Sequence, residues 1–298
     1  MNITDTQLLI DFLNKSNGIP LHVIQTTTSN WSQYVISIIV SLISMALIFM
    51  ILGQPLIQKT KEYIIKRKFN KIYKKSDKHY LIIKHGSPKG LFDSTNTMID
   101  RNNHIQIAKK IQDFNGEDFD LYLHTPGGEI FATQAISRLL QNYPGKIRAV
   151  IPLYAMSGGT YLTLSCDEIY MANTSCLGPI DPQIGNFFKY GSAKAWDKIV
   201  KMKGKKAEDS SISFDHIGKQ YTKTIATQLE SLLKDKVEDE KKRKELIKLF
   251  TEGNIEHGYP ITKEDLRKLG LDVKDMFPGM IVAGQLLINT RTTGIYGK

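Results

Sequence analysis

Two stretches of the sequence decide the fold: Asp120–Gly128, DLYLHTPGG, and Val150–Thr160, VIPLYAMSGGT. In each, a short apolar run leads into paired glycines and then into a segment with helical spacing, which is typical of a strand that turns directly into a helix. Further strands are predicted in 79–86 and 168–172, with an amphipathic helix in 104–114 between the first two strands. This alternation of strands and helices predicts an α/β domain built on a largely parallel sheet.

The two glycine pairs are expected to face one cleft, because ligands bind at the carboxyl ends of the strands in such sheets. Ser157 stands at the second junction and offers a hydroxyl nucleophile. The amides of Gly158 and of Gly127 or Gly128 follow strand ends, where backbone N–H groups are unpaired. Acyl transfer needs such a nucleophile together with donors for the developing oxyanion. The pattern therefore predicts an acyl-transfer site.

These two stretches, together with Cys166–Gly185 (CDEIYMANTSCLGPIDPQIG) and His257–Thr262 (HGYPIT), resemble the serine dehydrogenase proteinase family of Clp-fold peptidases. This family is related to signal peptide peptidase A and more distantly to the crotonases. The resemblance runs from about residue 100 to 270. It implies a crotonase/Clp-protease-like βα superhelix that usually forms homo-oligomers, with one N-terminal transmembrane helix. It also implies Ser157 as the nucleophile and Gly127, Gly128 and Gly158 as oxyanion-hole elements.

The general base is not fixed by the resemblance. Clp subunits place a histidine soon after the serine, but here that region contains Asp181 between two prolines and no histidine. Signal peptide peptidase A uses a lysine, and Lys198 lies in the corresponding lysine-rich helix. His257, which opens HGYPIT, is the other candidate, and Asp181 is expected to orient whichever base acts. Weaker candidates for the base are Lys205, Lys206 and Lys219, and His124 is expected to brace the first glycine loop.

A membrane span is predicted in 34–53, YVISIIVSLISMALIFMILG, which contains no charge and is long enough to cross a hydrocarbon core. Nine basic and two acidic residues follow in 59–78, whereas 1–33 contains Lys15 alone among lysines and arginines. This asymmetry predicts that the N-terminus is outside and the catalytic domain cytoplasmic. Since this segment carries most of the formal net charge of +10, it indicates contact with anionic lipid rather than nucleic acid.

The sequence thus divides into a short external tail (1–33), a transmembrane helix (34–53), a basic juxtamembrane linker (54–78) and a Clp-fold peptidase-like domain (79–290). The domain includes a lysine-rich helical arm at about 191–250. The two cysteines, Cys166 and Cys176, indicate a reducing compartment rather than a disulfide framework. No cofactor and no metal site are expected.

The function expected from these features is that of a membrane-anchored serine peptidase. It would cleave peptides or membrane-associated proteins through an acyl-enzyme on Ser157, with a lysine or histidine base. Two alternatives stay open. One is a crotonase-like enzyme that acts on acyl thioesters, because paired amides also polarise a thioester carbonyl. The other is a catalytically silent membrane scaffold of the same fold.

Overall fold

The computed structural model describes residues 11, 21–49, 54–74, 78–86, 97–290 and 293–297. The chain forms two compact units, Met1–Lys59 and Thr60–Lys298. In the first unit, helix α2 (Leu21–Ile48) contains the one described stretch that is long and apolar enough to cross a membrane, Trp31–Ile48. Its side chains from residue 31 onward are exposed. The end of the predicted span, 50–53, lies outside the described residues.

The second unit is built on a six-stranded sheet in the order β10-β5-β3-β2-β1-β11. Neighbouring strands are parallel, except that β11 runs antiparallel to β1. The register pairs Lys84 with His124 at the ends of β1 and β2, so the carboxyl ends of the strands form one edge. The strands are β1 (His79–Lys84), β2 (Phe119–His124), β3 (Ile147–Ile151), β5 (Glu168–Met171), β10 (Val273–Asp275) and β11 (Gly294–Gly297).

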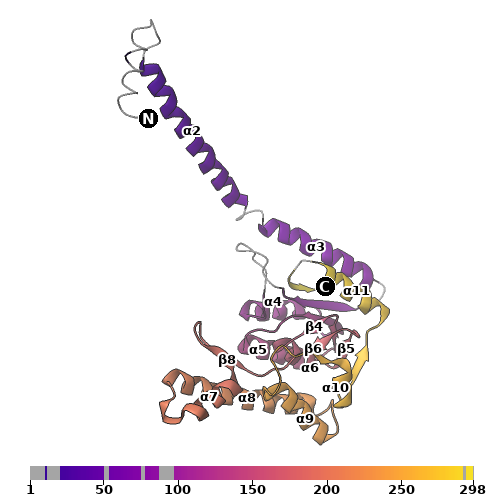
Figure 1. The fold of residues 1–298 in the computed structure, drawn as a ribbon. Helices are drawn as coiled ribbons and strands as arrows, with labels where there is room; N and C mark the ends of the chain where they lie inside the picture. The colour runs from indigo at the N-terminus through magenta and orange to yellow at the C-terminus, as the bar shows by residue number, and fades with distance from the viewer. Residues whose placement is uncertain are drawn as a thin grey trace. The chain divides into compact units, whose positions relative to one another are not determined.

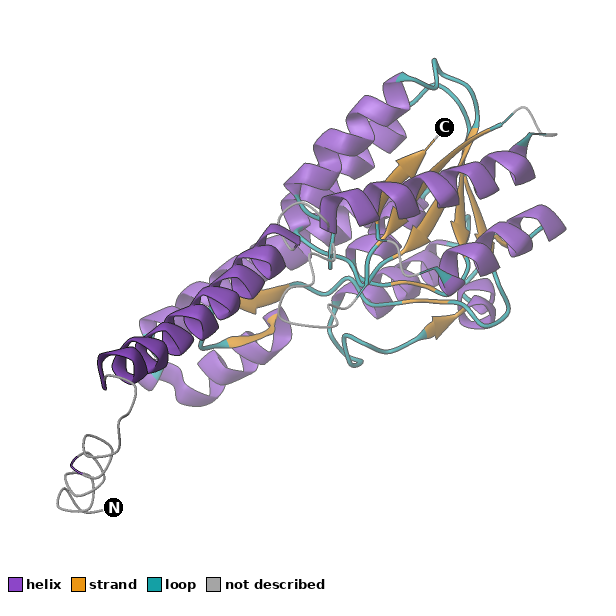
Figure 2. Ribbon diagram, turned by 90° about the horizontal axis from the view of Figure 1, so that it is seen from above, coloured by secondary structure: helices purple, strands orange, loops and turns teal. Residues whose placement is uncertain are grey.

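Helices cover both faces of this sheet (Figures 1 and 2). Successive strand residues point to opposite faces, so Leu121 and Leu123 enter one core while Tyr122 enters the other. The first core contains side chains of α4 (Arg101–Gln112), α5 (Ile130–Gln141), α6 (Gly158–Leu164), α8 (Asp209–Leu233) and α9 (Glu240–Thr251). The second contains side chains of α3 (Gln54–Tyr73) and α11 (Pro278–Asn289).

Smaller elements lie beyond the carboxyl ends of the strands. A three-stranded sheet has the order β4-β6-β9, and a hairpin joins β7 to β8. Helix α10 begins at a capping box that Thr262 and Asp265 form. These elements are β4 (Tyr154–Ala155), β6 (Cys176–Leu177), β7 (Gln183–Gly185), β8 (Tyr190–Ser192), α7 (Ala193–Lys203), the 3₁₀ turn η2 (Gly204–Lys206), β9 (Ile261–Thr262) and α10 (Lys263–Lys268).

The boundaries of this unit differ from the sequence-based division. The segment 54–78 was expected to be a linker, yet Ile65, Phe69 and Tyr73 of α3 are buried against the sheet. They recur every four residues, which is one helical face, but the lysines around them made the segment resemble a solvated linker. The domain also extends past residue 290, because β11 pairs with β1.

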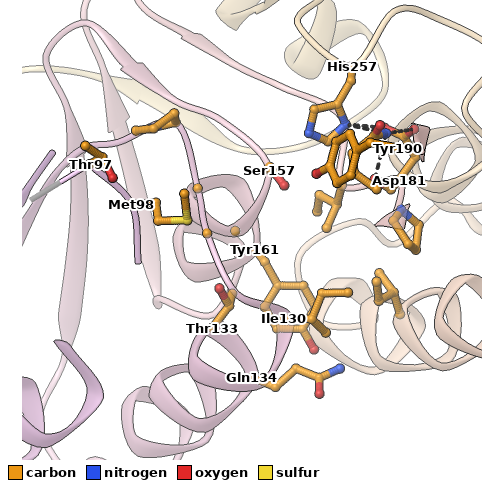
Figure 3. A pocket seen from close by; sticks show the side chains of 18 residues that line it. Thr97, Met98, Ile130, Thr133, Gln134, Ser157, Tyr161, Asp181, Tyr190 and His257 are labelled. Carbon is orange, nitrogen blue, oxygen red and sulfur yellow. Dashed lines mark hydrogen bonds and ion pairs between the residues drawn. The ribbon is translucent and has the colours of Figure 1, made fainter. Parts of the chain in front are cut away.

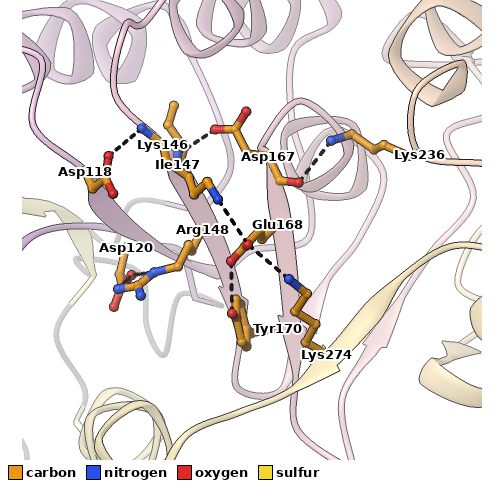
Figure 4. Close-up of polar contacts among 10 residues, drawn as sticks. All are labelled: Asp118, Asp120, Lys146, Ile147, Arg148, Asp167, Glu168, Tyr170, Lys236 and Lys274. Atoms are coloured by element: carbon orange, nitrogen blue, oxygen red, sulfur yellow. Dashed lines mark hydrogen bonds and ion pairs between the residues drawn. The ribbon is translucent and has the colours of Figure 1, made fainter.

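The amino edge of the sheet is closed by paired charges (Figure 4). The Glu168 carboxylate accepts hydrogen bonds from Tyr170 Oη at 2.9 Å, Lys274 Nζ at 3.0 Å and Lys146 Nζ at 3.4 Å. Burial raises the pKa of Glu168, but these three donors outweigh it and lower the pKa to about 2. These charged groups at the amino edge thus satisfy one another.

Candidate active site

The loops that follow β2 and β4 are hydrogen-bonded to each other. Thr125 N donates to Tyr154 O at 3.3 Å, and Met156 N donates to Thr125 O at 2.9 Å. A methyl group on Gly127 would lie 2.8 Å from both Ser157 Cβ and Gly158 N, so only glycine permits this approach. The two glycine-rich stretches therefore form adjacent walls of one site.

Ser157 has a strained backbone conformation, with φ 49° and ψ −114°. A positive φ at a residue other than glycine costs on the order of 1–3 kcal/mol and persists only where the surroundings enforce it. Ser157 directly precedes α6, but its hydroxyl makes no capping hydrogen bond. A serine on a sharp strand-to-helix turn presents its hydroxyl at the sheet edge. The Ser157 hydroxyl is thus available to a ligand.

Two backbone amides beside Ser157 are unpaired. Within the described ranges, no acceptor binds the N–H of Gly128 or of Gly158. Ile99 bonds the neighbours of Gly128, donating to Gly127 O at 2.7 Å and accepting from Glu129 N at 2.9 Å. The Gly128 amide therefore points away from Ile99 and from these two hydrogen bonds. A methyl group on Gly158 would lie 3.4 Å from Gly128 N, so the two amides lie close together.

Gly127 has a different role from Gly128 and Gly158, the other two glycines predicted for the oxyanion hole. Its N–H already donates to Thr125 Oγ1 at 3.1 Å. Its φ of +105° and the absence of a side chain allow the loop to turn against Ser157. Of the three glycines that the sequence indicates for an oxyanion hole, Gly128 and Gly158 have free amides, and Gly127 provides the space.

His257 and Asp181 form a close polar pair in the same pocket. His257 Nδ1 lies 2.6 Å from Asp181 Oδ1, and Gln183 Nε2 donates to Asp181 Oδ2 at 2.8 Å. The pair follows from the small sheet, in which β6 runs antiparallel to β9 with Leu177 opposite Ile261. Extending that register along both chains brings Asp181 opposite His257. The ring edge away from Asp181 faces the side of the pocket that holds Ser157 (Figure 3).

The structure does not bring Lys198 to this site. Lys198 is exposed on α7, and the residues that line the pocket in the described part of the chain include no lysine. Lys205 and Lys206 are exposed in η2. Lys219 is exposed on α8, where it pairs with the carboxylates of Asp197 and Asp215.

The pocket has a volume of about 250 Å³ and a mixed lining. One wall is apolar and includes Met98, Ile130 and Ile225. The Thr133 side chain also lines the pocket, although it is only 4% exposed. Its hydroxyl has no hydrogen-bond partner among the residues that the structure describes. The sequence analysis did not identify Thr133, because a threonine within an amphipathic helix gives no sign of facing a ligand.

The comparison with protein families gives the identity of the fold. The chain matches the ClpP-like SDH-type serine proteinases over residues 31–287. The chain belongs to this family. Membership confirms the resemblance drawn from the glycine motifs and the Clp-type α/β fold. The apolar stretch Trp31–Ile48 of α2 lies within the matched region.

Among curated proteins, this chain is similar to two uncharacterized proteins of Methanocaldococcus jannaschii. One is 42% identical over 160 residues and the other 39% over 159 residues, in each case 53% of this chain. The chain spans about half the length of these relatives, 54% and 53% respectively.

Two solved structures show lower similarity to this chain. A membrane-bound stomatin-specific protease is 17% identical, with a TM-score of 0.44 over 63% of this chain and 79% of that chain. ClpP1 from Listeria monocytogenes is 9% identical, with a TM-score of 0.43 over 73% of this chain and 99% of that chain.

A buried hydrogen-bond chain fixes the first glycine loop of this family member. His85 Nε2 lies 2.9 Å from Asn103 Oδ1, His85 Nδ1 lies 2.7 Å from Thr125 Oγ1, and that hydroxyl accepts from Gly127 N. Asn103 Oδ1 accepts, so His85 Nε2 carries the proton and Nδ1 accepts from Thr125. Burial lowers the pKa of His85, in keeping with a neutral ring. The sequence analysis did not identify His85 as a support.

His124, which was expected to brace the first glycine loop, packs against Tyr154 of the second loop. Its ring lies 4.3 Å from the Tyr154 ring, centroid to centroid, at the base of the second loop. It is therefore a buried packing residue at the end of β2. Burial and the nearby Lys84 and His85 lower its pKa to about 4.

Proposed function

We propose that this chain is a membrane-anchored serine peptidase in which Ser157 is the nucleophile, His257 the general base and Asp181 the residue that orients it. One observation carries the proposal. All three side chains line a single pocket beside the two unpaired amides of Gly128 and Gly158. The chain order Ser, Asp, His is no obstacle, since such triads occur in several orders and are recognised by geometry.

The hydrogen bonds assign the tautomer of His257. An ionised carboxylate only accepts hydrogen bonds, so Nδ1 donates to Asp181 at 2.6 Å. In the neutral ring, Nε2 is then unprotonated and can accept the hydroxyl proton of Ser157. Gln183 Nε2, although 3.2 Å from Nδ1, therefore binds Asp181 and not the ring. Both donors hold the carboxylate in place, and the carboxylate holds the ring.

The reaction follows from these roles. Ser157 Oγ attacks the peptide carbonyl carbon while its proton passes to His257 Nε2. The carbonyl oxygen becomes an oxyanion, which the N–H groups of Gly128 and Gly158 stabilise. His257 then protonates the leaving amine, and an acyl-enzyme on Ser157 remains. Water, deprotonated by His257, hydrolyses this ester and restores the serine.

A histidine base is favoured over Lys198 by burial. A lysine acts as a base near neutral pH only when desolvation lowers its pKa. Lys198 is exposed on α7 and is not among the described residues that line the pocket. His257 is half-buried and contacts the carboxylate of Asp181, which is 4% exposed. A buried carboxylate is the kind of partner that orients a catalytic histidine.

The same proposal includes the cellular arrangement. The apolar Trp31–Ile48 segment would span the membrane, and the basic residues that follow would keep the peptidase unit on the cytoplasmic side. Substrates would be peptides or membrane-associated proteins, and the enzyme would act as a homo-oligomer.

The two alternative functions predict different behaviour at Ser157. A crotonase-like enzyme needs the amides but no nucleophile, so Ser157→Ala would leave thioester turnover intact. A silent scaffold would not react with a fluorophosphonate. The strained backbone of Ser157 and the His257–Asp181 pair favour the peptidase, because neither alternative requires them.

The test uses the full chain in detergent micelles, with fluorescent casein as substrate and a fluorophosphonate as active-site probe. We expect Ser157→Ala to abolish both signals. His257→Ala and Asp181→Asn should each lower kcat by roughly 10³–10⁴-fold. Lys198→Ala is the matched control and should retain activity. Loss of activity in Lys198→Ala with retention in His257→Ala would contradict the assignment of the base.

A further inference from the structure

Helix α11 has an exposed surface without charge. No residue from Pro278 to Asn289 is ionisable. Met280, Ala283 and Leu287 are buried against the sheet, whereas Ile281, Val282 and Ile288 are exposed. In a chain with 23% charged residues, twelve consecutive uncharged residues with outward-facing aliphatic side chains mark a contact surface.

Helix α3 lies beside α11 on the same face of the sheet. Ile65, Phe69 and Tyr73 of α3 share one buried cluster with the inward side chains of α11, and the two helices neighbour each other in Figure 1. The outward side chains of α3 include the basic Lys66, Arg67, Lys68 and Lys71, which are all exposed, together with the exposed Tyr63 and Ile64. Among the α3 side chains that the structure describes, none is acidic.

The combined face therefore pairs an apolar helix with a basic helix. This is the composition of surfaces that lie in a membrane interface, where aliphatic groups enter the acyl boundary and lysines contact anionic headgroups. A second copy of this chain is a poorer occupant, because it would bring one lysine-rich helix against another. Sequence continuity also favours lipid, since α3 begins at Gln54, shortly after the candidate span ends at Ile48.

We propose that the α3/α11 face of the second unit rests on the bilayer surface, with Ile281, Val282 and Ile288 in the lipid interface and the α3 lysines on anionic headgroups. The inference builds on the proposed membrane anchoring and adds a second attachment at the far end of the chain. The pocket contains side chains of α5, α6 and α8, from the opposite layer. Docking on this face thus leaves the pocket open to segments that project from the membrane.

The test places a fluorescent label on each face of the full chain in phospholipid nanodiscs. Val282→Cys on α11 (54% exposed) and Ile212→Cys on α8 (47% exposed) carry an environment-sensitive NBD group. The background is Cys176→Ala, and Cys166 stays because it is buried and burial raises the pKa of its thiol. The discs contain phosphatidylcholine and phosphatidylglycerol with a nitroxide on the upper acyl chain. Circular dichroism checks folding, and Ile281→Cys replaces Val282→Cys if that variant misfolds.

We expect nitroxide lipid to quench the label at 282 several-fold more than the label at 212, and less strongly without phosphatidylglycerol. Water-like, unquenched emission at both positions would overturn the proposal. A blue-shifted but unquenched label at 282 would also overturn it, because protein and not lipid would then cover α11. The proposed span is tested separately by extraction with alkaline carbonate, and the proposed chemistry by the fluorophosphonate, so each can fail without the others.

Discussion

Replacing Thr133 by valine should stabilise the protein and impair it as an enzyme. The Thr133 hydroxyl is 4% exposed and unpaired in the part of the chain that the structure describes. A buried hydroxyl without a partner costs about 1–3 kcal/mol, and a valine methyl of similar size removes that cost. We expect a gain of about 1 kcal/mol in the free energy of unfolding, or roughly 2–4 °C in Tm for a domain of this size.

The effect on activity should have the opposite sign. Thr133 lines the pocket, and a methyl group on Gly158 would lie 2.6 Å from the Thr133 hydroxyl, so this hydroxyl lies directly behind the proposed oxyanion site. A hydrogen bond to the bound substrate is worth about 0.5–1.5 kcal/mol, which corresponds to a loss of roughly 2–13-fold in kcat/KM for Thr133→Val. Thr133→Ser should retain activity. Both quantities come from thermal unfolding and peptide cleavage by the same preparations.

A matched control separates burial from the missing partner. Thr251 is also 4% exposed, but its hydroxyl donates to Ile247 O at 2.8 Å. Thr251→Val removes a hydroxyl that is satisfied and leaves a carbonyl with one fewer donor, so it should destabilise the protein by about 1 kcal/mol and leave kcat/KM unchanged. If Thr133→Val destabilised the protein as much as Thr251→Val, the reasoning from the unpaired hydroxyl would be refuted.

Three further substitutions test the site and its support. Gly127→Ala should reduce cleavage at least about 100-fold and destabilise the protein by roughly 2–4 kcal/mol, because its methyl group would lie 2.8 Å from Ser157 Cβ and Gly158 N. Gly279→Ala is the control: a methyl group there would have no atom within 4 Å, so neither cleavage nor stability should change. Gln183→Leu should lower kcat about 10–100-fold with little change in KM, since it removes a donor to the Asp181 carboxylate; an unchanged kcat would exclude this positioning role. His124→Gln should reduce the loss of unfolding free energy at acidic pH, as measured by urea unfolding at several pH values. The His124 pKa of about 4 lies below the unfolded value, so the unfolded chain binds the proton first and up to about 3 kcal/mol is lost as pH falls from about 6.5 to 4.

The sequence predicted the features that depend on local patterns. An apolar run followed by paired glycines is a local signal, so the strand-to-helix turns at Gly127 and Ser157 and the parallel sheet could be anticipated. The cap of α10 at Thr262 is equally local. Helix α3 was missed as part of the core because its apolar face is a single line of residues, Ile65, Phe69 and Tyr73, among many lysines. A narrow stripe of this kind resembles a solvated helix until its neighbour is known.

The pairing of Asp181 with His257 could not be predicted from spacing. The two residues are brought together by the antiparallel register of β6 and β9, two strands of two residues each. Strands this short carry no periodicity from which a register can be predicted. Lys198 was a candidate base because signal peptide peptidase A uses a lysine and Lys198 lies in the corresponding segment, but the structure places it on an exposed helix face. The base that we propose, His257, depends on contacts distant in sequence rather than on motif spacing.

Several unfavourable local features of this fold lie together in one pocket. Ser157 has a positive φ, the amides of Gly128 and Gly158 lack acceptors, and the Thr133 hydroxyl lacks a partner, all within one pocket among the described residues. Each costs on the order of 1–3 kcal/mol, and together they are a large fraction of the 5–15 kcal/mol by which a domain is stable. At the amino edge, by contrast, the Glu168 carboxylate has three donors. A scaffold without catalytic function gains nothing from unpaired donors beside a strained serine, whereas a site that stabilises an oxyanion requires them. The combination of a strained serine, unpaired amides and an unpaired hydroxyl in one pocket therefore favours the peptidase independently of its motifs.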